Sequence, residues 1–121
     1  MRQTVLIVDD DAGFRASARA LLERHGFEVV SEAEDGAGAL RQADLLRPDV
    51  VLLDVQLPDL DGIEVAERLR NQGSTPGVVL TSTRAEDDYG PRLRSAAAAG
   101  FLGKADISGP ALVAMTMPRG R

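Results

Sequence analysis

Several acidic residues of this chain stand directly after short apolar runs, at positions where they could act together. One run is followed by Asp9, Asp10 and Asp11, and a later one is followed by Asp54. Carboxylates crowded into one crevice repel each other, and one of them takes up a proton unless a cation neutralises the group. Hard oxygen ligands in a small, partly wet cleft suit Mg²⁺, which uses one or two carboxylates and keeps several waters.

Two further groups could assist such a cluster. The hydroxyls of Thr81 and Ser82 follow another apolar run, and Lys104 follows the last one. A hydroxyl supplies a hydrogen-bond donor, and the ammonium group adds positive charge beside the metal. With the repulsion offset in this way, Asp54 could act as a nucleophile on a phosphoryl group, since aspartyl-phosphates are an established kind of intermediate. Positioning and charge stabilisation are the main requirements of that chemistry.

The apolar runs themselves predict the strands that position these residues. They are rich in valine and leucine and lack polar alternation, which is typical of strands buried on both faces of a parallel sheet. The five runs are Val5–Val8, Phe27–Val30, Val50–Leu53, Val78–Leu80 and Gly100–Leu102.

Helical patterns separate the runs. Phe14, Ala18, Leu21 and Leu22 share one face of a first helix, for which Asp11 is the expected N-cap and Gly26 the stop. Further helices are predicted over residues 37–46, ended by Pro48, over an apolar stripe of Ile63, Ala66 and Leu69 closed by Gly73 and Pro76, over residues 92–99, and over residues 110–117 after a Ser108-Gly109-Pro110 start.

Strand and helix alternate five times. Such alternation predicts right-handed crossovers and a doubly wound α/β fold, in which helices cover both faces of a five-stranded parallel sheet. Ligands of these sheets bind at the carboxyl ends of the strands, near the point where the strand order reverses. Asp9, Asp54, Ser82 and Lys104 should therefore meet on one rim of the sheet.

Composition narrows the class of protein. The 121 residues predict a single domain over 1–121, with a core from about residue 4 to 117 and no output domain within the chain. There is no cysteine for a disulfide or a thiolate metal site, and no apolar run approaches the ~20 residues that span a bilayer. The start lacks a secretory signal, so a cytoplasmic protein is expected. The net charge of −5 and the scattered arginines, apart from Arg119 and Arg121 in an expected solvated tail, argue against nucleic-acid binding.

Taken together, the motifs resemble those of response-regulator receiver domains of bacterial two-component systems. The segment Val5–Asp11 is similar to the opening of that family, and Asp54–Gly62 is similar to its phosphoacceptor strand end and following loop. Lys104 stands fifty residues after Asp54, and Ser82 stands twenty-two before Lys104, as in the family. The resemblance implies a flavodoxin-like (βα)5 fold with strand order 2-1-3-4-5.

The resemblance also implies a role for each site residue. Asp54 would be the phosphoacceptor, and Asp9, Asp10 and Asp54 would hold Mg²⁺ together with the backbone carbonyl of Gln56. Lys104 would pair with the phosphoryl group. The phosphoryl-sensing hydroxyl would be Ser82, with Thr81 as the second choice because counting from Pro76 favours it. Phe101 would be the aromatic switch residue, without a hydroxyl of its own.

Partners follow from the same resemblance. A sensor histidine kinase or phosphotransfer protein would donate the phosphoryl group, and a downstream protein target would respond, with a homodimer as one phosphorylated form. No direct nucleic-acid contact, no membrane contact and no enzymatic activity beyond self-phosphorylation and dephosphorylation are expected. Two departures bear on the site. Ala105 stands where many receivers have proline, and Gln56 and Arg84 occupy positions at which family members vary.

Other interpretations fit less well. A dinucleotide fold would need a third glycine where Arg41 stands, and a calcium EF-hand aligned on Gly62 would place Leu57 at a ligand position. A haloacid-dehalogenase-type phosphatase would need an aspartate in place of Gln56. Two alternatives stay open: a receiver-like binding module that is not phosphorylated, and the receiver part of a larger DNA-binding transcriptional regulator whose extension lies beyond Arg121.

Overall fold

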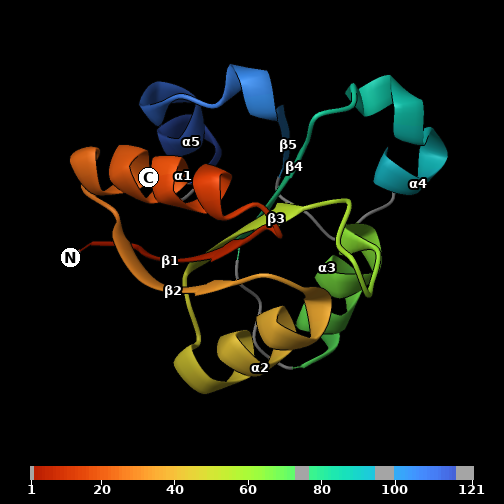
Figure 1. The fold of residues 1–121 in the computed structure, drawn as a ribbon, viewed down its shortest axis with the longest axis horizontal. Coiled ribbons are helices and arrows are strands. Elements are labelled where there is room, and N and C mark those ends of the chain that lie inside the picture. The colour runs from red at the N-terminus through yellow and green to blue at the C-terminus, as the bar shows by residue number, and fades with distance from the viewer. Residues whose placement is uncertain (1, 73–76, 95–99, 117–121) are drawn as a thin grey trace.

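The computed structural model describes residues 2–72, 77–94 and 100–116. Within them, five parallel strands form one sheet in the order β2-β1-β3-β4-β5 (Figure 1). The strands are β1 (Thr4–Val8), β2 (Glu28–Ala33), β3 (Val50–Asp54), β4 (Gly77–Ser82) and β5 (Gly100–Gly103). The α-helices are α1 (Ala12–Arg24), α2 (Gly36–Leu46), α3 (Gly62–Asn71), α4 (Pro91–Arg94) and α5 (Gly109–Thr116), and two 3₁₀ turns are η1 (Glu86–Tyr89) and η2 (Lys104–Asp106). The fold class and strand order predicted from sequence are confirmed.

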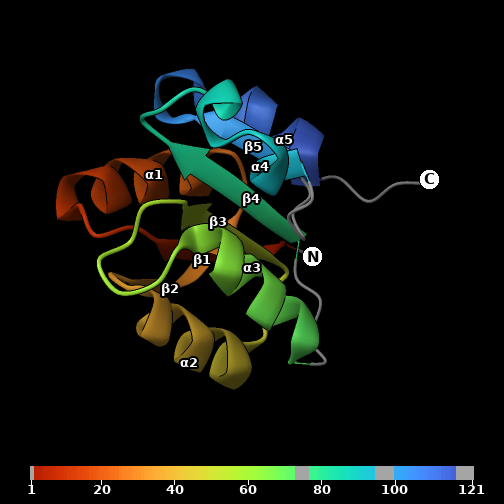
Figure 2. The same cartoon turned by 90° about the vertical axis from the view of Figure 1, so that its right-hand side faces the viewer.

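Helices cover both faces of the sheet. Figures 1 and 2 show α1 and α5 on one face and α2 and α3 on the other. Alternate residues of each strand feed two separate cores: Val5 and Ile7 of β1 pack toward α1 and α5, whereas Leu6 and Val8 pack toward α2 and α3. All four side chains are at most 1% exposed. Burial on both faces explains why these strands read as continuous apolar runs.

Local signals begin and end the helices as the sequence predicts. The Asp11 carboxylate accepts hydrogen bonds from the backbone of Gly13 and Phe14, which makes it the N-cap of α1. Gly26 has a φ of +91°, a conformation that favours glycine just after a helix. Before Pro48, Arg47 takes a left-handed conformation and ends α2.

Strand β2 differs from its predicted span. The apolar run suggested Phe27–Val30, but the strand begins at Glu28 and continues to Ala33. β2 is an edge strand, so polar residues such as Ser31 and Glu32 can remain in it while their backbone pairs with β1. Phe27 lies just before the strand and is only 6% exposed, as part of the core beneath α1. Hydrogen bonding to a neighbour, rather than side-chain hydrophobicity, decides where this strand ends.

Several predicted features of the second half of the chain fall partly or wholly outside the described residues. Helix α4 begins at Pro91, and the rest of the predicted 92–99 helix lies outside the described residues from 95 onward. The same holds for Gly73 and Pro76, for Met117 and for the arginines of the tail. The turn η1 was not predicted. No helix in the described ranges is long and apolar enough to cross a membrane.

Candidate functional site

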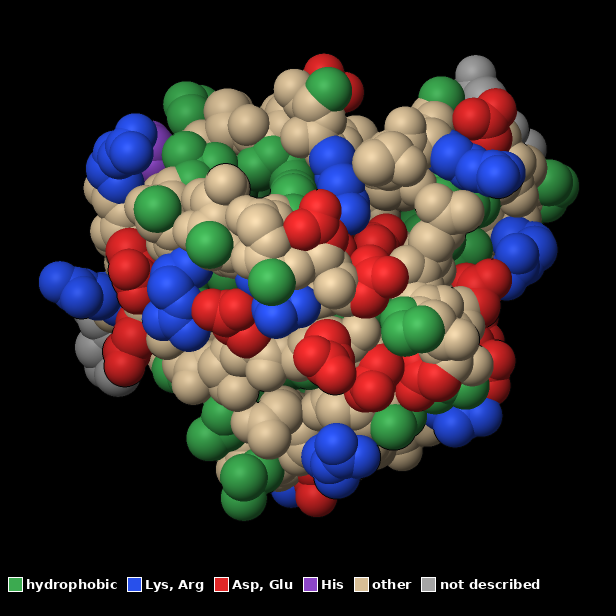
Figure 3. Space-filling model, viewed as in Figure 1, with side chains coloured by type: hydrophobic (Ala, Val, Ile, Leu, Met, Phe, Trp, Pro, Cys, Tyr) green, Lys and Arg blue, Asp and Glu red, His purple; other side chains and the backbone are tan. Residues whose placement is uncertain are grey.

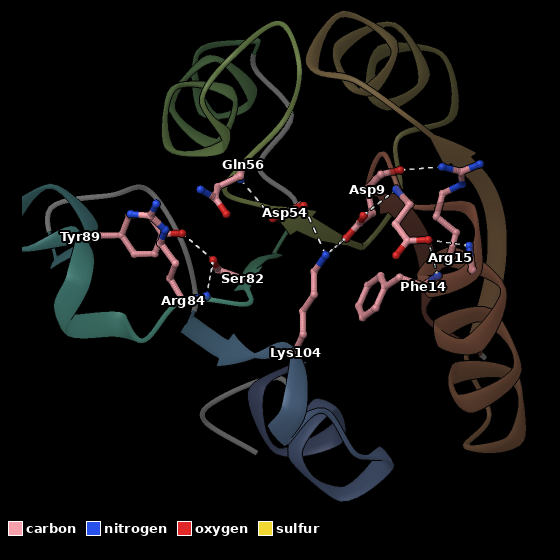
Figure 4. A network of polar contacts seen from close by, with 11 residues as sticks. Asp9, Phe14, Arg15, Asp54, Gln56, Ser82, Arg84, Tyr89 and Lys104 are labelled. Carbon is pink, nitrogen blue, oxygen red and sulfur yellow. Dashed lines mark hydrogen bonds and ion pairs between the residues drawn. The ribbon is translucent and has the colours of Figure 1, made fainter.

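Four strand ends meet at one rim of the sheet, as parallel order requires. Asp9 follows β1, Asp54 ends β3, Ser82 ends β4, and Lys104 follows β5. Asp9, Asp54 and Ser82 are 0%, 4% and 1% exposed, although each carries a polar side chain. Figure 4 shows Asp9, Asp54 and Lys104 pointing toward one another from separate elements. Burial of two carboxylates at the same point is costly unless cations or donors compensate.

Three carboxylates converge at this rim. One oxygen from each of Asp9, Asp10 and Asp54 lies within 4.8 Å of the others, with Asp10 exposed to solvent and the other two buried. Backbone N–H groups steady the buried pair: that of Asp11 donates to Asp9 Oδ1 at 2.9 Å, and that of Gln56 donates to Asp54 Oδ1 at 3.1 Å. Figure 3 shows acidic side chains gathered across the middle of this face. An all-oxygen donor set with one side open to water fits Mg²⁺.

Lys104 supplies the positive charge between the buried aspartates. Its Nζ lies 2.6 Å from Asp9 Oδ2 and 3.4 Å from Asp54 Oδ2. The same atom lies 4.5 Å from the ring centroid of Phe14 on α1, within the range of a cation–π contact. Two carboxylates and one aromatic face therefore hold the ammonium group in place (Figure 4).

The acidity of the site reflects this crowding. Burial raises the pKa of Asp54 above its usual value; the backbone N–H of Gln56 and the Lys104 charge oppose that shift, and the charge of Asp9 adds to it. Burial would lower the pKa of Lys104, but the contacts with Asp9 and Asp54 outweigh it and the net shift is upward. Lys104 is therefore charged at neutral pH, and Asp54 is ionised less readily than a surface aspartate.

The loop after β3 turns tightly against Asp54. The N–H of Gly62 donates to the carbonyl of Val55 at 2.8 Å. A Cβ at position 62 would lie 2.3 Å from the Asp54 carbonyl oxygen and 2.7 Å from Val55 Cα, both backbone atoms that cannot easily move. Only glycine permits this approach, so Gly62 helps to place the backbone from which the Asp54 side chain projects.

Asp59 ties the same loop to a neighbouring helix. Its carboxylate accepts from the backbone of Gly36 at 2.7 Å and of Ala37 at 3.0 Å, at the start of α2. These hydrogen bonds lower the pKa of Asp59. This carboxylate therefore holds the loop in place and is not among the three that converge at the rim.

The two hydroxyls at the end of β4 have different surroundings. Ser82 Oγ shares a hydrogen bond with Tyr89 Oη at 2.5 Å and accepts one from the N–H of Arg84 at 3.0 Å. Thr81 is fully buried, and its Oγ1 has no hydrogen-bond partner among the described residues. Alternation along the strand places the two side chains on opposite faces of the sheet. Neither hydroxyl is hydrogen-bonded to Asp54 in the described part of the chain.

The remaining predicted residues lie around this centre. Phe101, on β5, is half-buried, packs against the core beneath α2 and α3, and has its ring centroid 6.3 Å from that of Tyr89. The Gln56 backbone lies beside Asp54, to which its N–H donates. No cis peptide bond occurs in the described residues, so the bond between Lys104 and Ala105 is trans.

Three contacting residues were missed by sequence reasoning. From the sequence, Phe14 is expected only on the apolar face of its helix, and neither Tyr89 nor Arg15 has a predicted role. Arg15 donates from Nη1 to the Asp9 carbonyl at 2.6 Å and from Nε to Glu32 at 3.0 Å, so it buttresses the loop that carries the acidic pair. Helical periodicity marks Phe14 only as part of an apolar face, and no pattern marks Arg15 or Tyr89, because each of the three acts through a contact between different elements.

Comparison with known proteins identifies the family. The family model of the response regulator receiver domain matches residues 5–115. The transcriptional regulatory protein PdtaR of Mycobacterium tuberculosis is 39% identical over 100 residues, which are 83% of this chain and 48% of that protein. A protein-glutamate methylesterase/protein-glutamine glutaminase of Alkalilimnicola ehrlichii is 40% identical over 114 residues, 90% of this chain and 29% of that protein. The chain belongs to the response regulator receiver domain family.

Solved structures of response regulators have the same fold. A two-component response regulator of the LuxR family from Aurantimonas superposes with a TM-score of 0.84 at 28% identity, over 94% of this chain and 81% of that one. The response regulator domain of Thermotoga maritima CheB gives a TM-score of 0.82 at 27% identity, over 94% and 92% of the two chains. The chain spans about half the length, or less, of the first curated relatives that it matches.

Proposed function

We propose that this receiver domain accepts a phosphoryl group on Asp54 from a phosphohistidine of a sensor histidine kinase or phosphotransfer protein. The observation that carries the proposal is the position of Lys104 Nζ, 2.6 Å from Asp9 and 3.4 Å from Asp54, beside three converging carboxylates. A buried carboxylate with a fixed cation beside it is suited to attack phosphorus and to share its charge afterwards.

The transfer balances without any other reactant. An Asp54 carboxylate oxygen forms a bond to phosphorus while the bond from phosphorus to the donor imidazole nitrogen breaks. That nitrogen keeps the bonding pair, and the donor leaves as neutral imidazole when its other nitrogen carries a proton. Lys104 offsets the negative charge on the transferred group, and the Ser82 hydroxyl can turn to donate a hydrogen bond to one of its oxygens. Hydrolysis of the acyl phosphate returns Asp54 and inorganic phosphate.

Mg²⁺ fits the oxygen donors of the site. Asp9, Asp10 and Asp54 would hold it, and the Gln56 carbonyl would complete the protein ligands. When bound, the ion supplies positive charge that offsets the repulsion between the carboxylates and the incoming phosphoryl oxygens. Because the Lys104 ammonium occupies part of the space between the aspartates, we expect it to shift from Asp9 toward the phosphoryl group when the metal and phosphoryl group are present.

Phosphorylation would change the surface offered to a downstream protein target, and a phosphorylation-dependent homodimer would be one outcome. We expect a cytoplasmic location and no direct nucleic-acid contact by residues 1–121. The names and lengths of relatives such as PdtaR support a second possibility, in which this domain is the receiver part of a longer transcriptional regulator.

Intact-mass measurement with acetyl phosphate and Mg²⁺ tests the acceptor. The wild-type chain should gain one phosphoryl group, and Asp54→Asn should gain none. Asp44→Asn, an exposed aspartate on α2, provides the matched charge control and should label like the wild type. Equal labelling of wild type and Asp54→Asn would refute the assignment.

The metal requirement needs a separate measurement. Labelling should stop in EDTA and in an Asp9→Ala, Asp10→Ala double variant whose circular dichroism still matches that of the wild type. Normal Mg²⁺-dependent labelling of the double variant would show that Asp9 and Asp10 do not hold the metal.

A further inference from the structure

The shortest hydrogen bond of the Ser82 side chain leads away from the acidic centre. Ser82 Oγ and Tyr89 Oη are 2.5 Å apart, and the N–H of Arg84 donates to the same Ser82 oxygen. Figure 4 shows Tyr89 on the side of Ser82 opposite to Lys104. Tyr89 is the last residue of η1, directly before the Gly90 that leads into α4. A short hydrogen bond therefore joins the end of β4 to the segment between β4 and α4.

Phe101 cannot take part in this bond. It has no hydroxyl, and it meets Tyr89 only through a tilted ring contact, with centroids 6.3 Å apart and planes at 59°. Tyr89 is the only tyrosine of the chain. The aromatic group that can sense the Ser82 hydroxyl by hydrogen bonding is therefore on η1, whereas Phe101 on β5 is a packing partner.

We propose that Tyr89 is the residue that reads the phosphorylation state of Asp54, through its hydrogen bond to Ser82. The inference rests on the proposed function. To donate to a phosphoryl oxygen on Asp54, the Ser82 hydroxyl must turn toward the acidic centre, because it makes no hydrogen bond to Asp54 in the described residues. Turning moves Oγ away from Tyr89. A bond to a charged phosphoryl oxygen is about twice as strong as one between neutral hydroxyls, so the phosphoryl group wins the competition.

The released phenol then changes the segment that carries it. Gly90 has a φ of +64° with open space where a Cβ would stand, and the Leu93 N–H bonds back to the Gly90 carbonyl. Because Gly90 has no side chain to restrict its backbone, η1 can change its angle to α4 there. The start of α4 is held in place by the buried Leu93 and by the ion pair between Arg92 and Asp61. The phosphoryl signal leaves the site along Ser82, Tyr89 and η1, and Phe101 adjusts to the new position of the Tyr89 ring.

The composition of the chain makes this directly measurable. With one tyrosine and no tryptophan, the intrinsic fluorescence of the protein comes from Tyr89. Beryllofluoride with Mg²⁺, as the phosphoryl mimic, should change the fluorescence of the wild type as the phenol loses its partner. Phe101→Leu, which leaves both hydroxyls in place, should keep most of that change. Free Ser82→Ala should already show the fluorescence of the mimic-bound wild type.

A second variant tests the hydroxyl alone. Tyr89→Phe removes one oxygen and keeps the ring, so Asp54 should still gain a phosphoryl group by intact mass. Amide NMR signals of residues 85–94 in the free variant should lie near their wild-type positions with the mimic bound, and adding the mimic should move them by less than about half the wild-type change. Signals around Asp9 and Asp54 should still respond fully.

The outcomes separate the two proposals. If Asp54 is labelled but wild-type fluorescence does not change, or if Tyr89→Phe responds like the wild type over residues 85–94, the Tyr89 inference is wrong and the proposed function stands. If Phe101→Leu abolishes the fluorescence change and Tyr89→Phe does not alter the NMR response, Phe101 and not Tyr89 is the switch residue. If intact mass shows no labelling of the wild type, the proposed function fails and this inference fails with it.

Discussion

The two sides of the site differ in how firmly they are held. On one side, β1 and β3 are central strands with almost every side chain buried, Arg15 and the N–H of Asp11 hold Asp9, and Phe14 contacts the Lys104 ammonium group. On the other, all four residues of β5 are only partly buried, and the contact between β4 and η1 depends on hydroxyls. Local opening costs least where few apolar groups are buried. The carboxylates therefore lie among firmly packed strands, and we expect local opening to cost least at β5 and η1.

Truncation of one core leucine on each side should expose this difference. Leu53 of β3 is 0% exposed, so Leu53→Ala should lower the free energy of unfolding by about 2–5 kcal/mol. Leu102→Ala on half-buried β5 should cost less than about 2 kcal/mol, because part of that side chain already faces water. Urea unfolding of both variants measures the two costs. Equal losses would mean that β5 is as firmly packed as β3.

Substitution of Gly62, the glycine packed against the Asp54 backbone, should also destabilise the fold. Gly62→Ala places a methyl group against the Asp54 carbonyl, so it should destabilise the fold by about 1–3 kcal/mol or more and reduce labelling of Asp54. Gly77→Ala is the matched control on β4, where the nearest atom to a new Cβ is 3.7 Å away. It should change stability by less than about 1 kcal/mol. Thermal unfolding measures the stability of both variants, and intact mass measures labelling of Asp54. Normal labelling of Gly62→Ala would show that the loop can move without disturbing Asp54.

The unequal hydroxyls of β4 offer a finer test. Thr81 buries a hydroxyl that has no hydrogen-bond partner in the described residues, so Thr81→Val should raise the free energy of unfolding by about 1 kcal/mol. Ser82→Ala removes a hydroxyl with two partners and should lower it by about 0.5–1.5 kcal/mol. Urea unfolding of the two variants should therefore move in opposite directions. A loss in Thr81→Val would mean that its hydroxyl does have a partner in solution.

The smallest expected effect concerns Glu32 of β2, which pairs with Arg15 and Arg19 of α1. Hydrogen bonds from Arg19 and then Arg15 lower the pKa of this partly buried carboxyl, against the opposing effect of burial. A carboxyl whose pKa is lowered by folding stabilises the fold above its unfolded pKa, and that contribution disappears as pH falls through the folded pKa. Glu32→Gln should cost about 0.5–1 kcal/mol at neutral pH and almost nothing in strong acid.

Urea unfolding of Glu32→Gln at neutral pH and in strong acid checks whether its cost in stability disappears as the pH falls. Glu23→Gln, which loses a single, longer contact with Arg19 at the surface, should cost less at neutral pH. A cost for Glu32→Gln that persists unchanged in acid would show that packing of the side chain, not its charge, is responsible.

Much of the fold and part of the site could be read from the chain itself. Apolar runs, the Asp11 cap and the Gly26 stop are local features, and each acts through neighbours a few residues away. Parallel order then places Asp9, Asp54 and Lys104 at one rim without further information. The boundaries of β2 could not be read, because pairing with β1 extends it over polar residues.

What the sequence determined alone is therefore the order of elements and the residues at the strand ends, since both follow from local pattern and the geometry of parallel strands. The tertiary structure decided which side chains meet there. Phe14 against Lys104, Arg15 against the Asp9 carbonyl and Tyr89 against Ser82 each join different elements. Ser82 and Tyr89 are only seven positions apart, but one ends a strand and the other ends a 3₁₀ turn, so no single period relates them. Their contacts depend on how helices and turns pack on the sheet, which no local signal encodes.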